Sequence, residues 1–213
     1  MSNDLTFIHR FEPGNRPEAP PLLVLHGTGG DESDLLPLGR AVAPGSALLA
    51  PRGKVLEHGM PRFFRRLAEG VFDENDVRRR AHELADFVEA SRGKYGIAPP
   101  VALGYSNGAN IAAAVLLLRP EALAGAILLR SMVPLAKAPQ PDLRGKRVLI
   151  VSGKFDPIIP ASTSAQLAAM LTNAGAIVQH PMLPVGHELS QADLTIGQQW
   201  MRATPILQGQ GAA

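Results

Sequence analysis

The chain has 213 residues, of which 46% are hydrophobic and 19% charged, and its formal net charge is +2. This length fits one domain over residues 1–213, with a frayed tail at about 204–213. Without cysteine, disulfides, thiolate catalysis and cysteine-based zinc sites are excluded. We expect no membrane insertion, no signal peptide and a cytoplasmic location, since the sequence lacks long apolar runs and a basic-then-apolar start. The arginines form no stripe with aromatic residues, so we expect no nucleic-acid partner.

Short apolar runs alternate with helical patterns along the chain. The predicted strands cover residues 5–11, 22–25, 47–50, 101–103, 124–129, 148–151 and 176–180. The predicted helices cover residues 34–41, 73–93, 111–118 and 161–174, and a capping box at Ser190 and Asp193 begins a last helix through Trp200. This alternation predicts an α/β fold with a mainly parallel sheet and helices on both faces. In such sheets, active sites lie at the carboxyl ends of the strands.

The least regular stretch covers residues 54–72, which glycine and proline interrupt. Its apolar side chains are Met60, Phe63, Phe64 and Phe72. Irregular loops normally lie on the surface, so three phenylalanines here indicate a segment folded over the core or over a substrate pocket. The neighbouring basic residues are Arg62, Arg65 and Arg66. We interpret them as a solvated face, with contacts to a partner or an acidic substrate as the alternative.

The stretch Gly104-Tyr105-Ser106-Asn107-Gly108 follows a predicted buried strand and precedes a long apolar run. GxSxG between a strand and a helix is the pattern of a nucleophile elbow, in which a serine occupies a strained turn. Ser106 would then project at a helix N-terminus, where free N–H groups favour negative charge. GxSxG also recurs by chance in loops rich in glycine and serine, so the assignment depends on whether partners follow.

A serine hydroxyl needs a general base, and the base needs a third group that orients it. Of the six histidines, His187 lies in a loop after the last predicted strand and before the C-terminal helix. His26 also follows a strand, but it precedes Ser106 in the chain. Asp156 lies in another loop after a strand, which the following proline stiffens; an Asx-turn is the alternative, since Asp-Pro opens many turns. The order Ser106, Asp156, His187 is that of elbow hydrolases, so we predict a catalytic triad.

The glycine-rich turn that begins at His26 follows the predicted strand 22–25. It lacks the Lys-Ser/Thr ending of a P-loop and the dinucleotide spacing, which leaves an anion-accepting loop or a flexible connection. Acyl transfer needs two backbone N–H donors at the oxyanion, one from the residue after the nucleophile and one from a loop after an early strand. We therefore predict Asn107 and Thr28 as these donors, and His26 as a residue that orders the loop.

Together these motifs resemble the phospholipase/carboxylesterase family of α/β-hydrolases, which includes acyl-protein thioesterases. They are most similar to its small bacterial carboxylesterase branch, which includes hydroquinone-linked hydrolases. The matching pieces are L-H-G-T-G-G-D-E-x-D-L (25–35), P-R-G (51–53), G-Y-S-N-G-A (104–109), G-K-x-D-P-I-I-P (153–160) and G-H-E-L (186–189). The resemblance implies an α/β-hydrolase fold without a cap domain, serine-based hydrolysis of esters or thioesters, and no cofactor. The sequence departs from the thioesterase forms H-G-L-G-D and G-F-S-Q-G-G at Thr28, Asn107 and Ala109.

These inferences favour a serine carboxylesterase that cleaves short- to medium-chain or aromatic esters through an acyl-enzyme on Ser106, with no metal. Candidates for an apolar pocket wall are Met60, Phe63, Phe64, Phe72, Met132 and Ile158, and core packing is the alternative for each. Other hypotheses are an acyl thioesterase, or a lysophospholipase that contacts a membrane surface through residues 62–66. A hypothesis of another class is a non-catalytic module that binds a hydrophobic ligand or a protein. The resemblance also implies a homodimer.

Overall fold

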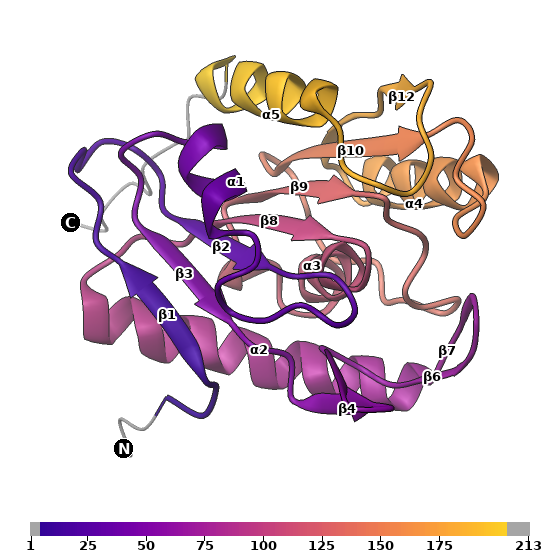
Figure 1. Ribbon diagram of the computed structural model, residues 1–213, viewed down its shortest axis with the longest axis horizontal. Coiled ribbons are helices and arrows are strands. Elements are labelled where there is room, and N and C mark those ends of the chain that lie inside the picture. The colour runs from indigo at the N-terminus through magenta and orange to yellow at the C-terminus, as the bar shows by residue number, and fades with distance from the viewer. Residues whose placement is uncertain (1–4, 204–213) are drawn as a thin grey trace.

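The computed structural model of the protein describes residues 5–203 (Figure 1). The strands of the main sheet are β1 (His9–Glu12), β2 (Leu22–Leu25), β3 (Leu48–Pro51), β8 (Val101–Tyr105), β9 (Gly125–Leu129), β10 (Arg147–Gly153), β11 (Ile177–Gln179) and β12 (Met182–Leu183). Two hairpins pair β4 (Val55–Glu57) with β5 (Met60–Arg62) and β6 (Arg66–Ala68) with β7 (Val71–Phe72). The helices are α1 (Leu36–Val42), α2 (Glu74–Tyr95), α3 (Asn107–Leu118), α4 (Ala161–Asn173), α5 (Gln191–Ala203) and a 3₁₀ turn, η1 (Pro120–Ala122).

The main sheet is mostly parallel, with the strand order β1-β3-β2-β8-β9-β10-β11 and with β12 paired to β10. Strand β1 runs antiparallel to β3, whereas the ladders from β3 through β11 are parallel. The chain first moves outward from β2 to β3 and then crosses back to β8 on the other side of β2. The winding therefore reverses at β2 and β8, and open α/β sheets bind ligands at the carboxyl ends of strands at such a reversal.

Helices cover both faces of the sheet, with α1 and α5 on one face and α2, α3 and α4 on the other (Figure 1). Successive side chains of a strand point to opposite faces. Leu23 and Leu25 of β2 therefore join the core under α2, α3 and α4, whereas Leu22 and Val24 join the core that includes Trp200 of α5. Because all four strand residues are buried, β2 has a continuous apolar sequence rather than an alternating one.

Some element boundaries differ from those that the sequence predicts. Helix α2 does not end at Gly93, because the residue that adopts the left-handed C-cap conformation is Gly96, with φ 65°. Residues 54–72 are two hairpins rather than an irregular loop. Helix α3 begins at Asn107, so the turn and the helix join directly at Ser106. The tail predicted to fray lies outside the described residues.

The connections at the carboxyl edge of the sheet leave it open. Within residues 5–203 these connections are loops and the two short hairpins, and no cap domain covers them. The carboxyl edge at β2 and β8 is therefore accessible.

Within residues 5–203, no helix combines the length and the apolar character that crossing a membrane requires.

Candidate active site

Ser106 occupies the turn between β8 and α3, where the elbow pattern predicts a serine. Its backbone adopts φ 52° and ψ −112°, a left-handed conformation that is costly for a residue with a Cβ atom. The Ser106 N–H donates to Leu129 O at 2.8 Å, which ties the turn to β9. The following helix lies so close to β2 that a Cβ atom at Gly108 would be 2.2 Å from Leu25 O. Glycine at this position therefore allows the strained turn and the helix to pack together.

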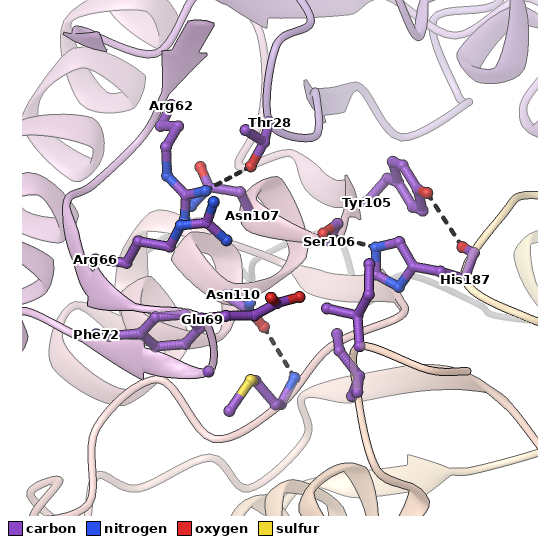
Figure 2. Close-up of a pocket in the computed structure, with 14 residues that line it drawn as sticks. Thr28, Arg62, Arg66, Glu69, Phe72, Tyr105, Ser106, Asn107, Asn110 and His187 are labelled. Carbon is purple, nitrogen blue, oxygen red and sulfur yellow. Dashed lines mark hydrogen bonds between the residues drawn. The ribbon is translucent and has the colours of Figure 1, made fainter. Parts of the chain in front are cut away.

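The side chains of Ser106, His187 and Asp156 form one chain of hydrogen bonds. His187 Nε2 lies 3.0 Å from Ser106 Oγ (Figure 2), and His187 Nδ1 lies 2.8 Å from Asp156 Oδ2. The Asp156 side chain is 1% exposed, and its Oδ1 accepts from the N–H groups of Ile158 and Ile159 at 2.8 and 2.9 Å. An ionised carboxylate only accepts, so Nδ1 carries the imidazole proton and Nε2 is free to accept the serine proton.

Arg130, which the sequence analysis does not single out, holds the loop that carries His187. It follows β9 directly and is fully buried. Its guanidinium donates to Gly186 O at 3.0 Å and to Glu188 O at 2.9 Å, the carbonyls on either side of His187. The same guanidinium pairs with Asp193 at 2.7 Å and 2.9 Å in a bidentate contact. Two buried charges thus satisfy each other and fix the position of the histidine loop.

Two further contacts anchor this loop. Tyr105 OH, next to the nucleophile in sequence, donates to His187 O at 3.1 Å. Asp193 accepts from Ser190 N at 2.8 Å and from Ser190 Oγ at 2.7 Å. One half of the predicted capping box therefore forms, whereas Ser190 Oγ donates to the Asp193 carboxylate and the Asp193 N–H donates to Ser190 O. The carboxylate that caps α5 is therefore the same one that neutralises the buried arginine.

Arg62 at the end of β5 and Phe63, the residue that follows it, contact the two residues predicted as oxyanion donors. Arg62 Nη1 donates to Thr28 Oγ1 at 2.7 Å, and Phe63 N donates to Asn107 Oδ1 at 2.7 Å. Among the described residues, no backbone hydrogen bond uses the N–H of Thr28, and the N–H of Asn107 lies in the first turn of α3, where helices leave it unpaired. The side chains of the two residues are held while their N–H groups stay available.

His26 orders the loop after β2, as the sequence predicts. Its Nδ1 donates to Gly27 O at 2.6 Å, and its Nε2 accepts from Gly53 N at 3.0 Å. The ring is 1% exposed and packs against the Phe63 ring, with 4.7 Å between centroids. Burial lowers the pKa of His26, which keeps the ring neutral, with one donor and one acceptor nitrogen.

A pocket of about 340 Å³ opens at Ser106 and His187. Its apolar lining residues are Phe72, Met132, Ile158 and Ile159. Its polar lining includes Arg62, Arg66, Glu69 and Asn110, and Figure 2 shows the two arginines across the pocket from His187, with Phe72 next to Glu69. Within residues 5–203, no group of three or more His, Asp or Glu side chains is arranged to hold a metal ion.

The structure corrects part of the predicted pocket wall. Phe63 and Phe64 are 2% and 0% exposed and belong to the main core rather than to the pocket. Met60 is exposed on its hairpin and lies beside Gly29 instead of lining the pocket. Because the chain folds back between the two hairpins, the rings of Phe63 and Phe64 reach the core. Burial of large apolar side chains there stabilises the fold.

The arginines of this segment also differ from the prediction of a solvated face. Arg65 is exposed, but Arg62 is 3% exposed and Arg66 is half-buried, and both of these line the pocket. No pattern in the sequence distinguishes Arg62 from its neighbours, since its burial depends on hairpin pairing. For Arg130 there was a signal, because it stands at the carboxyl end of the predicted strand 124–129.

Comparison with known proteins identifies the family of the chain. The model of the Phospholipase/Carboxylesterase family matches residues 8–204. Over 196 residues the chain is 44% identical to the "Putative hydrolase MhqD" of Bacillus subtilis (strain 168), a match that covers 91% of this chain and 97% of that protein. The Bacillus cereus carboxylesterase structure has a TM-score of 0.90 and 44% identity, with 92% and 94% of the two chains covered. A carboxylesterase structure from Mesorhizobium loti has a TM-score of 0.84 and 33% identity, with 90% and 91% covered.

The fold, an open and mostly parallel sheet with helices on both faces, is that of the α/β-hydrolases. The chain belongs to the phospholipase/carboxylesterase family, a family of hydrolytic enzymes.

Proposed function

We propose that this hydrolase is a serine carboxylesterase that works through an acyl-enzyme on Ser106. The observation that carries the proposal is the chain of hydrogen bonds from Asp156 through His187 to Ser106. The serine lies on a strained turn that presents Oγ to a pocket. A serine without an oriented base would remain a weak nucleophile. Membership of the family supports hydrolysis, and the geometry supports the role of each residue.

The reaction follows from these positions. His187 Nε2 takes the Ser106 hydroxyl proton while Oγ attacks the ester carbonyl, and Asp156 stabilises the imidazolium. The N–H groups of Thr28 and Asn107 donate to the oxyanion of the tetrahedral intermediate. The imidazolium then gives its proton to the leaving alcohol, and the acyl group stays on Ser106. Water, activated by the same imidazole, attacks the acyl-enzyme and releases the carboxylic acid.

The pocket supports small to medium-sized esters as substrates. Its volume of about 340 Å³ is at the low end of ligand pockets in proteins. Phe72, Met132 and Ile158 supply apolar surface for an acyl chain or an aromatic leaving group. A lysophospholipase that contacts membranes through residues 62–66 has less support, because the two phenylalanines of this segment are buried.

A thioester would react through the same steps as an ester. Comparing kcat/KM for an ester and a thioester of the same acyl chain decides whether the enzyme is an esterase or a thioesterase.

The direct test is hydrolysis of p-nitrophenyl acetate by Ser106→Ala. We expect kcat to fall by about 10⁵-fold or more, because the nucleophile is gone. Ser162→Ala, at an exposed serine of α4, is the matched control and should keep wild-type activity. Full activity in Ser106→Ala would contradict the proposal, and an inactive wild type with intact folding would favour the non-catalytic binding module instead.

We also propose a cytoplasmic location and a homodimer for this enzyme. The absence of cysteine is compatible with a reducing compartment, and the family resemblance supports a dimer. Light scattering on the purified protein tests the oligomeric state, because a monomer mass of 22.6 kDa would exclude the dimer.

A further inference from the structure

The polar side of the pocket contains two guanidinium groups that share one carboxylate. Arg66 Nε donates to Glu57 Oε1 at 2.8 Å, and Arg62 Nε lies 3.1 Å from Glu57 Oε2. The side chains of Arg62 and Arg66 are 4% and 30% exposed. Figure 2 shows both guanidiniums on the side of the pocket next to Thr28 and Asn107, across from His187.

This cluster has a net positive charge at neutral pH. Arg66 lowers the pKa of Glu57 chiefly through their hydrogen bond, so Glu57 is ionised and the three side chains sum to one positive charge. Burial lowers the pKa of Arg62 and outweighs the attraction of Glu57, while the neighbouring Arg66 lowers it further. Glu57 therefore balances only one of the two guanidinium charges at this wall.

One other charged side chain lines this part of the pocket. Glu69 is exposed, and no ion pair within 4.0 Å joins it to either arginine in the described part of the chain. The Nη atoms of Arg66 likewise make no hydrogen bond within residues 5–203. A guanidinium with both terminal nitrogens available, at the wall of the pocket that contains the nucleophile, can bind a carboxylate in bidentate fashion.

We propose that Arg62 and Arg66 form an anion subsite, and that the enzyme prefers esters that carry a free carboxylate away from the scissile bond. This inference rests on the proposed esterase function and adds the class of substrate. The apolar side of the pocket, with Met132 and Ile158, takes the carbon chain, and the arginine side takes the charged end. Hydrolysis proceeds at the ester carbonyl as described above, and the second carboxylate takes no part in bond making or breaking. The carboxylate can belong to the acyl part or to the alcohol part of the ester.

Competition against p-nitrophenyl acetate measures the preference for each part separately. For the acyl part, the pair is monomethyl glutarate and its carboxamide isostere, methyl 5-amino-5-oxopentanoate. For the alcohol part, the pair is 4-acetoxybutanoate and 4-acetoxybutanamide. We expect the carboxylate member of at least one pair to have an inhibition constant about tenfold lower than its amide, as one charge-assisted bidentate contact provides. The pair that shows the preference identifies the part of the ester that contacts the arginines.

The variant Arg66→Gln should remove this preference, and Arg66→Lys should keep part of it because the charge remains. Arg65→Gln is the matched control, since Arg65 is next in sequence but exposed and paired with Asp73, and it should keep the preference. Equal inhibition by carboxylate and amide in the wild type, or a preference that survives Arg66→Gln, would overturn the proposal. Equal losses for both members of a pair in Arg66→Gln would also overturn it, because the guanidinium would then act on the oxyanion rather than on a substrate carboxylate.

Failure of this inference can be separated from failure of the esterase function. A wild type that hydrolyses p-nitrophenyl acetate without preferring carboxylates leaves the esterase in place and removes the subsite. A wild type that does not hydrolyse p-nitrophenyl acetate removes the esterase, and calorimetric titration with monomethyl glutarate and its uncharged carboxamide isostere then tests the subsite by binding alone. Tighter binding of monomethyl glutarate that Arg66→Gln abolishes supports the subsite, and equal binding of the two compounds overturns it.

Discussion

Both carboxylate oxygens of Asp156 accept hydrogen bonds from within the protein. Oδ2 accepts from His187 Nδ1, and Oδ1 accepts from two backbone N–H groups of its own loop. The proline after it fixes the chain direction, and the carboxylate is almost fully buried. An aspartate in this position selects one tautomer of the imidazole, so its charge matters to the reaction as well as to the fold.

We therefore predict that Asp156→Asn lowers kcat for p-nitrophenyl acetate by about 10⁴-fold. The amide can donate to His187 Nδ1, which places the ring proton on Nε2, and Nε2 can then no longer accept the Ser106 proton. The melting temperature and KM should change little, since asparagine has nearly the same shape. A variant with kcat within tenfold of the wild type would contradict the role of Asp156. Asp142→Asn, at an exposed aspartate paired with Arg144, is the control.

Single residues were predictable from the sequence where each one lies in a turn or loop after a predicted strand, in the chain order of elbow hydrolases. Ser106, Asp156 and His187 have this property, and the structure places their side chains in hydrogen-bond contact. The burial of Phe63 and of Arg62 was not predictable, because it depends on how a short hairpin pairs and folds back. Arg130 shows a limit of a different kind: its position is visible in the sequence, but its partners are loop carbonyls far along the chain.

At the scale of elements, the sequence predicts strands that are buried on both faces better than it predicts hairpins. Strand β2 has the bounds that its apolar run gives, because burial on both sides requires apolar residues at every position. The strands β4 to β7 are two or three residues long and include exposed positions, so they leave no periodic signal. The end of α2 was misplaced because a glycine within a helix and a glycine at its C-cap look alike in sequence.

The buried ion pair Arg130–Asp193 holds β9, the loop that carries His187 and helix α5 together. We predict that Arg130→Gln lowers the free energy of unfolding by about 3–5 kcal/mol, because Asp193 is left as an unpaired buried charge. Its kcat should fall as well, since the carbonyls beside His187 lose their donors. The double variant Arg130→Gln/Asp193→Asn should recover part of the stability. Urea unfolding measures these values, and a wild-type value for Arg130→Gln would contradict this role.

Arg119→Gln is a matched control for the buried pair. Arg119 pairs with Asp86 and Glu121 at the surface, where the acidic side chains are 68% and 62% exposed. An exposed ion pair of this kind contributes about 1 kcal/mol or less. The two arginine variants should therefore differ clearly in stability.

At the scale of the whole molecule, stability should fall on mild acidification. Burial lowers the pKa values of both His26 and His180 below the ordinary value of 6.5. Below about pH 6.5 the unfolded chain therefore binds more protons than the folded chain. The stabilisation from these neutral rings is fully present above about pH 6.5 and is lost as the pH falls toward the pKa values of the folded state. Paired carboxylates such as Glu57, whose pKa is lowered from 4.5, reduce the stability when they are protonated at lower pH.

Urea unfolding at pH 7.5 and pH 5.5 measures this dependence. We expect a lower free energy of unfolding at pH 5.5, and a smaller difference between the two pH values in His180→Gln. His82→Gln, at an exposed histidine of α2, should show the wild-type difference. Greater stability at pH 5.5 than at pH 7.5 in the wild type would contradict the lowered pKa values of His26 and His180.

Ser106 is the residue that we propose becomes acylated, and covalent trapping tests this role most directly. A fluorophosphonate probe reacts with a serine that an oriented base activates, and mass spectrometry of the digested protein locates the adduct. We predict one adduct, on Ser106, that is absent in Ser106→Ala and strongly reduced in His187→Ala. An adduct on another residue, or an unlabelled wild type that still hydrolyses p-nitrophenyl acetate, would contradict the claim.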